Sequence, residues 1–120
     1  MESGQRSVAF ESQVRSIVID LLVLLADGDY EGIKERCSGS GVTSDELQEI
    51  IRDYGRKVIA PPADYACINM YEREATAVPT WAVEADLWTE EEGRSDLTLS
   101  MTVAFGPSGP AIRLDSLHVL

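Results

Sequence analysis

The sequence has little of what metal sites and disulfide scaffolds need. Its 120 residues contain two cysteines and one histidine, and Cys37 and Cys67 lie far apart without a C-x-x-C pair. A zinc site takes four such ligands at close spacing, so this pattern argues against one. We interpret the two cysteines as reduced, partly buried thiols; a disulfide between them is the alternative.

A long hydrophobic run is also missing. The apolar run Ile17–Leu25 is interrupted by Asp20 and is far shorter than the roughly 20 residues that a membrane span requires. Glu2 precedes any basic residue, and no small-residue cleavage site follows the run, so the N-terminus does not resemble a signal peptide. We therefore predict a cytoplasmic protein that does not bind membranes.

Positive charge is scarce. Ten Lys and Arg against 21 Asp and Glu give a net charge of −11, and the isoelectric point is near 4.3. Such a surface repels phosphate backbones, so nucleic acid is disfavoured as a partner, whereas a basic protein suits it. The apolar fraction of 44% is that of an ordinary globular chain, and this length suits one domain.

Two helices are predicted at the start of this single domain, residues 1–120. Apolar residues recur every three or four positions over Val14–Leu25, and Gly28 ends this helix because glycine is the usual left-handed cap. A short helix from Tyr30 to about Cys37 follows. Residues 1–7 precede the periodic pattern and are predicted to be disordered.

A third helix is predicted after a loop at residues 38–41. Thr43 and Glu46 have the spacing of a capping box, and Arg56 and Lys57 would lie in the last turn. Pro61-Pro62 is expected to end the helix. Its apolar face is predicted to contain Leu47, Ile50, Ile51, Tyr54 and Val58.

From Tyr65 the apolar period changes to two, which indicates half-buried antiparallel strands. Four strands in a meander are predicted, at Tyr65–Arg73, Trp81–Trp88, Leu97–Phe105 and Ala111–Val119. In the last strand Leu114 and Leu117 fall on opposite faces, so we expect a bulge near Ser116. The fold class is therefore α+β.

Two stretches resemble known families. Residues 26–33, A-D-G-D-Y-E-G-I, resemble the helix-to-helix corner of nuclear transport factor 2-like domains. Residues 86–99, D-L-W-T-E-E-E-G-R-S-D-L-T-L, and the final L-H-V-L resemble an uncharacterised bacterial family of small soluble domains. The resemblance runs from Val14 onward. It implies a cone-shaped fold, with three N-terminal helices packed on a curved four-stranded antiparallel meander sheet, and no known activity.

Catalytic chemistry is not evident. Ketosteroid-isomerase-like and dehydratase-like members of the cone superfamily place an Asp or His with Tyr partners in an apolar pocket. The inward positions of the two clearest strands supply no general acid or base: Trp81, Val83, Ala85, Leu87, Leu97, Leu99, Met101 and Val103. The lone His118 has no suitably placed carboxylate, and no G-x-S-x-G or phosphate loop exists. We predict no catalytic residue, no cofactor, no metal and no enzymatic activity.

The most distinctive local feature is an acidic hairpin, in which Glu91-Glu92-Gly93 predicts a type I turn closed by a left-handed glycine. The candidate interaction surface comprises Asp86, Trp88, Glu90, Glu91, Glu92, Arg94 and Asp96. The alternative is a solvated turn, in which Arg94 pairs across the strands while Ser95 and Asp96 bond local backbone. Calcium is the third reading, although the spacing is not that of a D-x-D-x-D-G loop.

Trp88 lies on the polar face of its strand beside Glu84 and Asp86, so its large ring needs a cover. A helix or the C-terminal Leu117 and Val119 would cover it within the chain. The alternative is a second subunit, in a homodimer formed through the outer sheet face.

Three functions remain open. The leading hypothesis is a non-enzymatic protein-interaction module, of immunity type if its partner is a basic toxin. The second is a small-ligand-binding or vestigial enzymatic cone, with Tyr54, Tyr65 or Tyr71 converging into a pocket between the long helix and the sheet. The third is a structural homodimer subunit.

Overall fold

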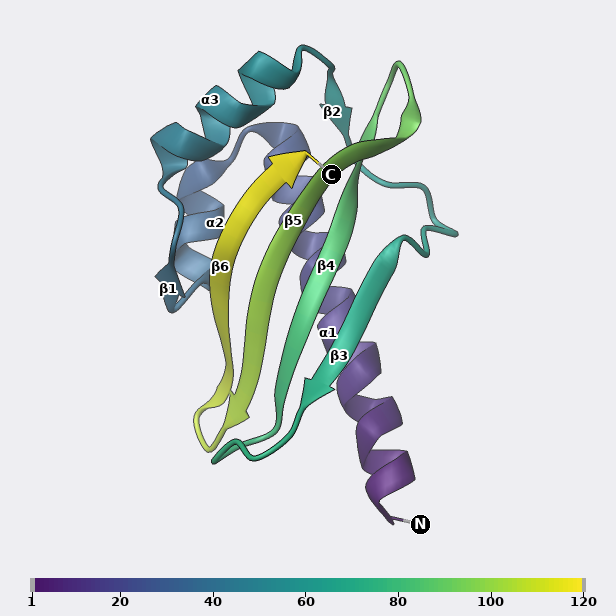
Figure 1. Ribbon diagram of the computed structural model, residues 1–120, viewed down its shortest axis with the longest axis vertical. Coiled ribbons are helices and arrows are strands. Elements are labelled where there is room, and N and C mark those ends of the chain that lie inside the picture. The colour runs from purple at the N-terminus through teal and green to yellow at the C-terminus, as the bar shows by residue number, and fades with distance from the viewer. Residues whose placement is uncertain (1, 120) are drawn as a thin grey trace.

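The computed structural model describes the backbone of residues 2–119 and the side chains of residues 9–119 (Figure 1). Its helices are α1 (Glu2–Asp27), α2 (Tyr30–Arg36) and α3 (Ser44–Tyr54). Its strands are β1 (Gly39–Ser40), β2 (Val58–Ile59), β3 (Ile68–Arg73), β4 (Thr80–Thr89), β5 (Gly93–Gly106) and β6 (Gly109–Val119). The expectations for residues 1–7 and for Leu120 fall wholly or partly outside the described residues and stay predictions.

The class prediction, α+β, is confirmed, but the sheet differs from the predicted one. Strands β3, β4, β5 and β6 form the expected antiparallel meander. Two short strands extend it to a six-stranded mixed sheet: β1 pairs in parallel with β6, and β2 pairs with β4 beyond the end of β3. Ser38 and Gly41 donate backbone hydrogen bonds to the carbonyls of Ile112 and Leu114, both at 2.7 Å, so the predicted loop is in fact a sheet edge.

The third helix begins as predicted and ends earlier. Thr43 and Glu46 form the capping box, with distances of 3.0 and 3.1 Å between side-chain oxygens and backbone nitrogens. The prediction that the helix reaches Pro61 is wrong. Gly55, with φ of 75°, caps the helix through bonds to the carbonyls of Ile51 and Arg52. Residues 56 and 57 therefore follow the helix, and residue 58 lies in β2.

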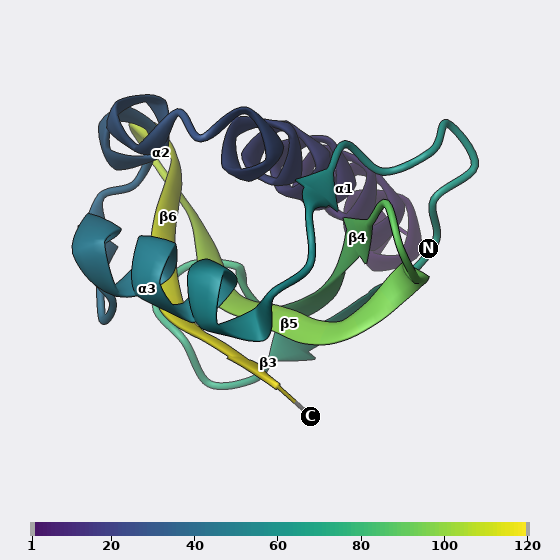
Figure 2. The same ribbon diagram turned by 90° about the horizontal axis from the view of Figure 1, so that it is seen from above.

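The sheet curves around α1, which covers its inner face, while α2 and α3 lie toward the β6 side (Figure 2). All eight predicted inward residues of β4 and β5 are at most 3% exposed, so that prediction is confirmed. They pack with the buried α1 residues Val14, Val18, Leu21, Leu22 and Leu25. Ile17, predicted on the same face, is only half-buried.

Two irregularities interrupt the strand pairing. The predicted bulge in β6 is confirmed: Ser100 pairs with Ser116 and Met101 with Leu114, so Asp115 is the extra residue. It lets Leu114 and Leu117 both point into the core, because an extra residue reverses the alternation. A second register shift, not predicted, lies in the β4–β5 pairing beyond Asp86 and positions the candidate site.

Candidate functional site

The β4–β5 hairpin ends in a three-residue connection closed by a left-handed glycine, as predicted. Thr89 pairs with Gly93, and Glu90–Glu92 form the connection, called here the hairpin tip. Gly93 has φ of 72°, the left-handed conformation that closes such a turn. A Cβ at this position would lie 3.5 Å from the Trp88 ring. The hairpin tip projects at one end of the molecule beside β2 (Figure 1).

The hairpin tip is held against the end of α3. The Tyr54 hydroxyl donates to Glu92 Oε1 at 2.8 Å and accepts from the backbone N–H of Asp96 at 3.3 Å. The backbone N–H of Lys57 donates to Glu91 Oε1 at 2.9 Å, and the Lys57 carbonyl accepts from the Glu90 N–H at 2.9 Å. Hydrogen bonds therefore hold the carboxylates of Glu91 and Glu92, while all three tip side chains are exposed to solvent. The interaction surface and the solvated turn both stay predictions.

Asp86 is a buried structural carboxylate. It is 7% exposed, accepts from Arg94 Nε at 2.7 Å and accepts from the Thr98 hydroxyl at 3.0 Å. The hydrogen bond that Arg94 donates to Asp86 also raises the pKa of the exposed Arg94 guanidinium. Ser95 Oγ donates to the Leu87 carbonyl at 2.7 Å. The cross-strand pairing of Arg94 is thus present, and Asp86 is not available to a partner.

Trp88 is covered from within the chain. Its half-buried ring packs edge-on against Tyr65, with 6.0 Å between ring centroids and 85° between planes. The cover is thus the segment that precedes β3, and neither Leu117 nor Val119 is its stacking partner. Trp88 needs no second subunit on this side of the ring, and the homodimer stays a prediction.

Folding adds acidic residues that the sequence analysis missed. Asp45, Glu49 and Asp53 are four residues apart on α3 and all are exposed. The Tyr54 and Lys57 contacts place the end of α3 beside the hairpin tip. The acidic surface is defined here as two groups of exposed carboxylates, Glu90, Glu91, Glu92 and Asp96 on the hairpin and Asp45, Glu49 and Asp53 along α3. Asp53 is next to Tyr54 at the end of α3 that contacts the tip, and Asp45 is at the opposite end of the helix. The four-residue spacing of these acidic residues is visible in the sequence. The contact between the end of α3 and the hairpin is not.

The acidic surface is not neutralised by ion pairs. Within residues 9–119, charged side chains lie within 4.0 Å of each other in three pairs, which are Arg36–Asp20, Arg94–Asp86 and Arg113–Asp115. No pair includes a member of the acidic surface, although Arg52, Arg56 and Lys57 are nearby in sequence. These carboxylates therefore present negative charge to the solvent.

Replacing Tyr54 with phenylalanine tests whether these contacts hold the tip. We expect the free energy of unfolding to fall by about 1 kcal/mol or less, because the lost hydrogen bonds are exposed. Amide hydrogen exchange at Glu92 and Asp96 should become faster. Tyr71→Phe is the matched control, since Tyr71 is 55% exposed and lies away from the tip. Unchanged exchange in Tyr54→Phe would show that the tip holds its position without Tyr54.

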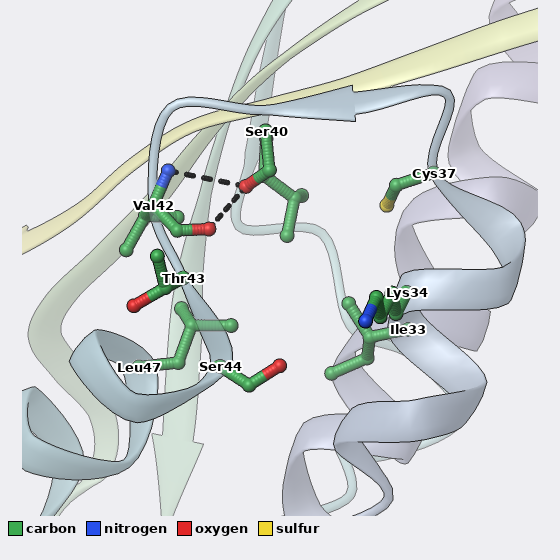
Figure 3. Close-up of a pocket in the computed structure, with 9 residues that line it drawn as sticks. Ile33, Lys34, Cys37, Ser40, Val42, Thr43, Ser44 and Leu47 are labelled. Carbon is green, nitrogen blue, oxygen red and sulfur yellow. Dashed lines mark hydrogen bonds between the residues drawn. The ribbon is translucent and has the colours of Figure 1, made fainter.

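A cavity of about 270 Å³ lies between α2, β1, the start of α3 and β6 (Figure 3). No residue of α1 lines it, so it is not the predicted pocket between the long helix and the sheet. The three tyrosines do not converge there: Tyr54 contacts the hairpin tip, Tyr65 is 1% exposed in the core, and Tyr71 is mostly exposed. No pattern in the sequence predicted this cavity, and residues 38–41 were expected only to form a loop.

The remaining candidates are accounted for by ordinary contacts. Cys37 and Cys67 are free thiols, as predicted, and His118 Nδ1 lies 3.0 Å from the Ser116 hydroxyl. In the described part of the chain, no group of three or more His, Cys, Asp or Glu is placed to hold a metal ion. No described helix is long and apolar enough to cross a membrane.

Comparison with known proteins assigns a family. Residues 22–120 match the family described as Domain of unknown function (DUF7668), and the chain belongs to this family. The match begins within α1 and includes every other helix and strand of the fold. No curated protein and no solved structure gives a significant match.

Proposed function

We propose that this protein is a non-enzymatic interaction module that binds a basic protein through the acidic surface. The supporting observation is that the carboxylates of Glu91 and Glu92 are held by Tyr54 and the Lys57 backbone, and that no described cation lies within 4.0 Å of them. A surface fixed before binding loses less conformational entropy on association. Clustered, unpaired negative charge also accelerates encounter with a basic partner. An immunity protein that neutralises a basic toxin would have such a surface.

We also propose that the fold is related to a known superfamily. A curved sheet that wraps a long N-terminal helix supports a relationship to the cone-shaped nuclear transport factor 2-like domains (Figure 2). The short edge strands β1 and β2 are additions to the simple meander expected from that resemblance. Fold alone brings no chemistry, so the function rests on the acidic surface.

Charge reversal on the acidic surface tests the proposal. The variant combines Glu49→Lys, Asp53→Lys and Glu90→Lys, because none of these side chains makes a hydrogen bond that holds the tip. We expect affinity capture of the bound protein, quantified by mass spectrometry, to fall more than about tenfold. Reversing Glu91 and Glu92 is avoided, since it would also break the contacts to Lys57 and Tyr54.

The matched control reverses Glu11, Glu31 and Glu35, which are exposed on α1 and α2. Both triple variants raise the net charge by the same amount, so a general effect of charge would reduce capture equally. The proposal requires loss in the first variant alone and a captured protein that is basic. Equal capture by wild type and the acidic-surface variant would refute it.

A further inference from the structure

The α2–α3 cavity has apolar walls and a polar side. Residues from α2, from β1 and its loop, from α3 and from β6 line it: Ile33, Lys34, Cys37, Ser40, Val42, Thr43, Ser44, Leu47 and Leu114. Ile33, Val42, Leu47 and Leu114 are at most 7% exposed, so their side chains form a floor continuous with the core. A volume of about 270 Å³ is near the lower end of the roughly 300–1,000 Å³ usual for small-molecule pockets.

Hydrogen bonds fix the positions of the segments that line the cavity. β1 is attached to β6 by hydrogen bonds from Ser38 and Gly41, and the capping box fixes the start of α3. The Ser40 hydroxyl bonds to both the N–H and the carbonyl of Val42, as the dashed lines in Figure 3 show. A Cβ on Gly41 would lie 3.0 Å from the Asp115 carbonyl oxygen, a tight contact that favours glycine at this position. The cavity is therefore a property of the folded backbone.

The polar groups at the cavity are suited to one negative charge. Lys34 is the only cation among the lining residues, and no carboxylate of residues 9–119 lies within 4.0 Å of it. The Ser44 hydroxyl points across the cavity toward α2 (Figure 3). Cys37 Sγ also points inward, and burial raises the pKa of its thiol, which keeps it neutral. No negative charge therefore comes from the walls themselves.

We propose that this cavity binds a small monocarboxylate whose alkyl chain or ring fills the apolar floor. Its carboxylate would pair with Lys34 and accept from the Ser44 hydroxyl. The volume equals about nine waters at roughly 30 Å³ each, which suits an acid of roughly six to eight carbons. A dianion such as phosphate is disfavoured, because Asp45 and Glu46 lie in the adjacent turn and the chain carries a net charge of −11.

Titration with octanoate, followed by amide NMR spectra of the full chain, tests this site. We expect millimolar octanoate to shift the amide signals of residues 33–47 and of Leu114. Octan-1-ol has the same alkyl chain but no charge. It should shift the same signals but bind with about fivefold lower affinity. Shifts confined to other residues, or equal binding of the acid and the alcohol, would overturn the proposal.

Two variants separate the charge from the cavity. Lys34→Met should weaken octanoate binding about fivefold and leave octan-1-ol unchanged, whereas Lys57→Met, at the only other lysine, should change neither. Val42→Phe should fill the cavity and abolish binding of both probes. Thermal unfolding verifies that it folds, and if it does not, the Lys34→Met comparison decides alone. Octanoate bound equally by Lys34→Met and wild type would refute the proposed pairing.

Discussion

Replacing Tyr65 with alanine is expected to lower the free energy of unfolding by about 3–5 kcal/mol, the usual cost of deleting a buried aromatic ring. Tyr65 is 1% exposed. Its hydroxyl donates to the carbonyls of Cys67, at 3.0 Å, and of Asp86, and its own carbonyl accepts from the Arg15 guanidinium. The Tyr65 side chain thus joins the segment before β3 to the irregular part of β4, while the contact to α1 is made by its backbone and is kept in the variant. This loss is a large part of the total free energy of unfolding of a typical domain, which is about 5–15 kcal/mol.

Urea unfolding monitored by circular dichroism measures this loss. Tyr65→Phe keeps the ring against Trp88 and removes only the hydroxyl, so it should cost about 1–2 kcal/mol. Tyr71→Ala, at a mostly exposed position, should change stability by about 0.5 kcal/mol or less. If Tyr65→Ala were as stable as Tyr71→Ala, the proposed central role of Tyr65 in packing would be wrong.

Alkaline pH should destabilise the fold through the same residue. Burial raises the pKa of the Tyr65 hydroxyl well above its ordinary value near 10, with nearby Asp86 adding to the shift. Above about pH 10 the unfolded chain releases this proton while the folded chain keeps it. The stability from Tyr65 is therefore complete below about pH 10 and is lost above it, at up to about 1.4 kcal/mol per pH unit.

Comparison with Tyr65→Phe isolates this effect from other groups. Burial also raises the pKa values of Cys37, Tyr30 and Tyr54, so wild-type stability alone reports several ionisations. The advantage of wild type over Tyr65→Phe should shrink by about 1 kcal/mol between about pH 9.5 and about pH 11. A constant difference over that range would mean that Tyr65 ionises as easily in the folded chain as in the unfolded one.

The regular elements could be predicted from the sequence because their signals are local. The apolar period over Val14–Leu25, the Thr43–Glu46 box and the alternation of β4 and β5 all appear where predicted. The bulge beside Ser116 could also be predicted, since its reversed alternation is visible in six residues. These patterns depend on backbone periodicity and side-chain size, which act over a few residues.

Most of the errors arose where distant segments pair. β1 and β2 are two residues long, and their pairing with β6 and β4 has no pattern of its own. The role of Asp86 was missed for the same reason. Its burial depends on Thr98 and Arg94 lying across the β4–β5 pairing. The end of α3 is an error of another kind, because Gly55 is a local left-handed cap that the prediction passed over in favour of Pro61-Pro62.

By itself, the sequence determined an acidic α+β chain with helices first, a meander after them and an acidic turn at Glu90–Glu92. Composition and local periodicity are sufficient for that, because they depend only on residue type and on neighbours along the chain. Only the tertiary structure decided that this turn is held by Tyr54, that the end of α3 lies beside it, and that a cavity opens near Lys34. Those features depend on contacts between residues far apart in the chain, which local pattern does not encode.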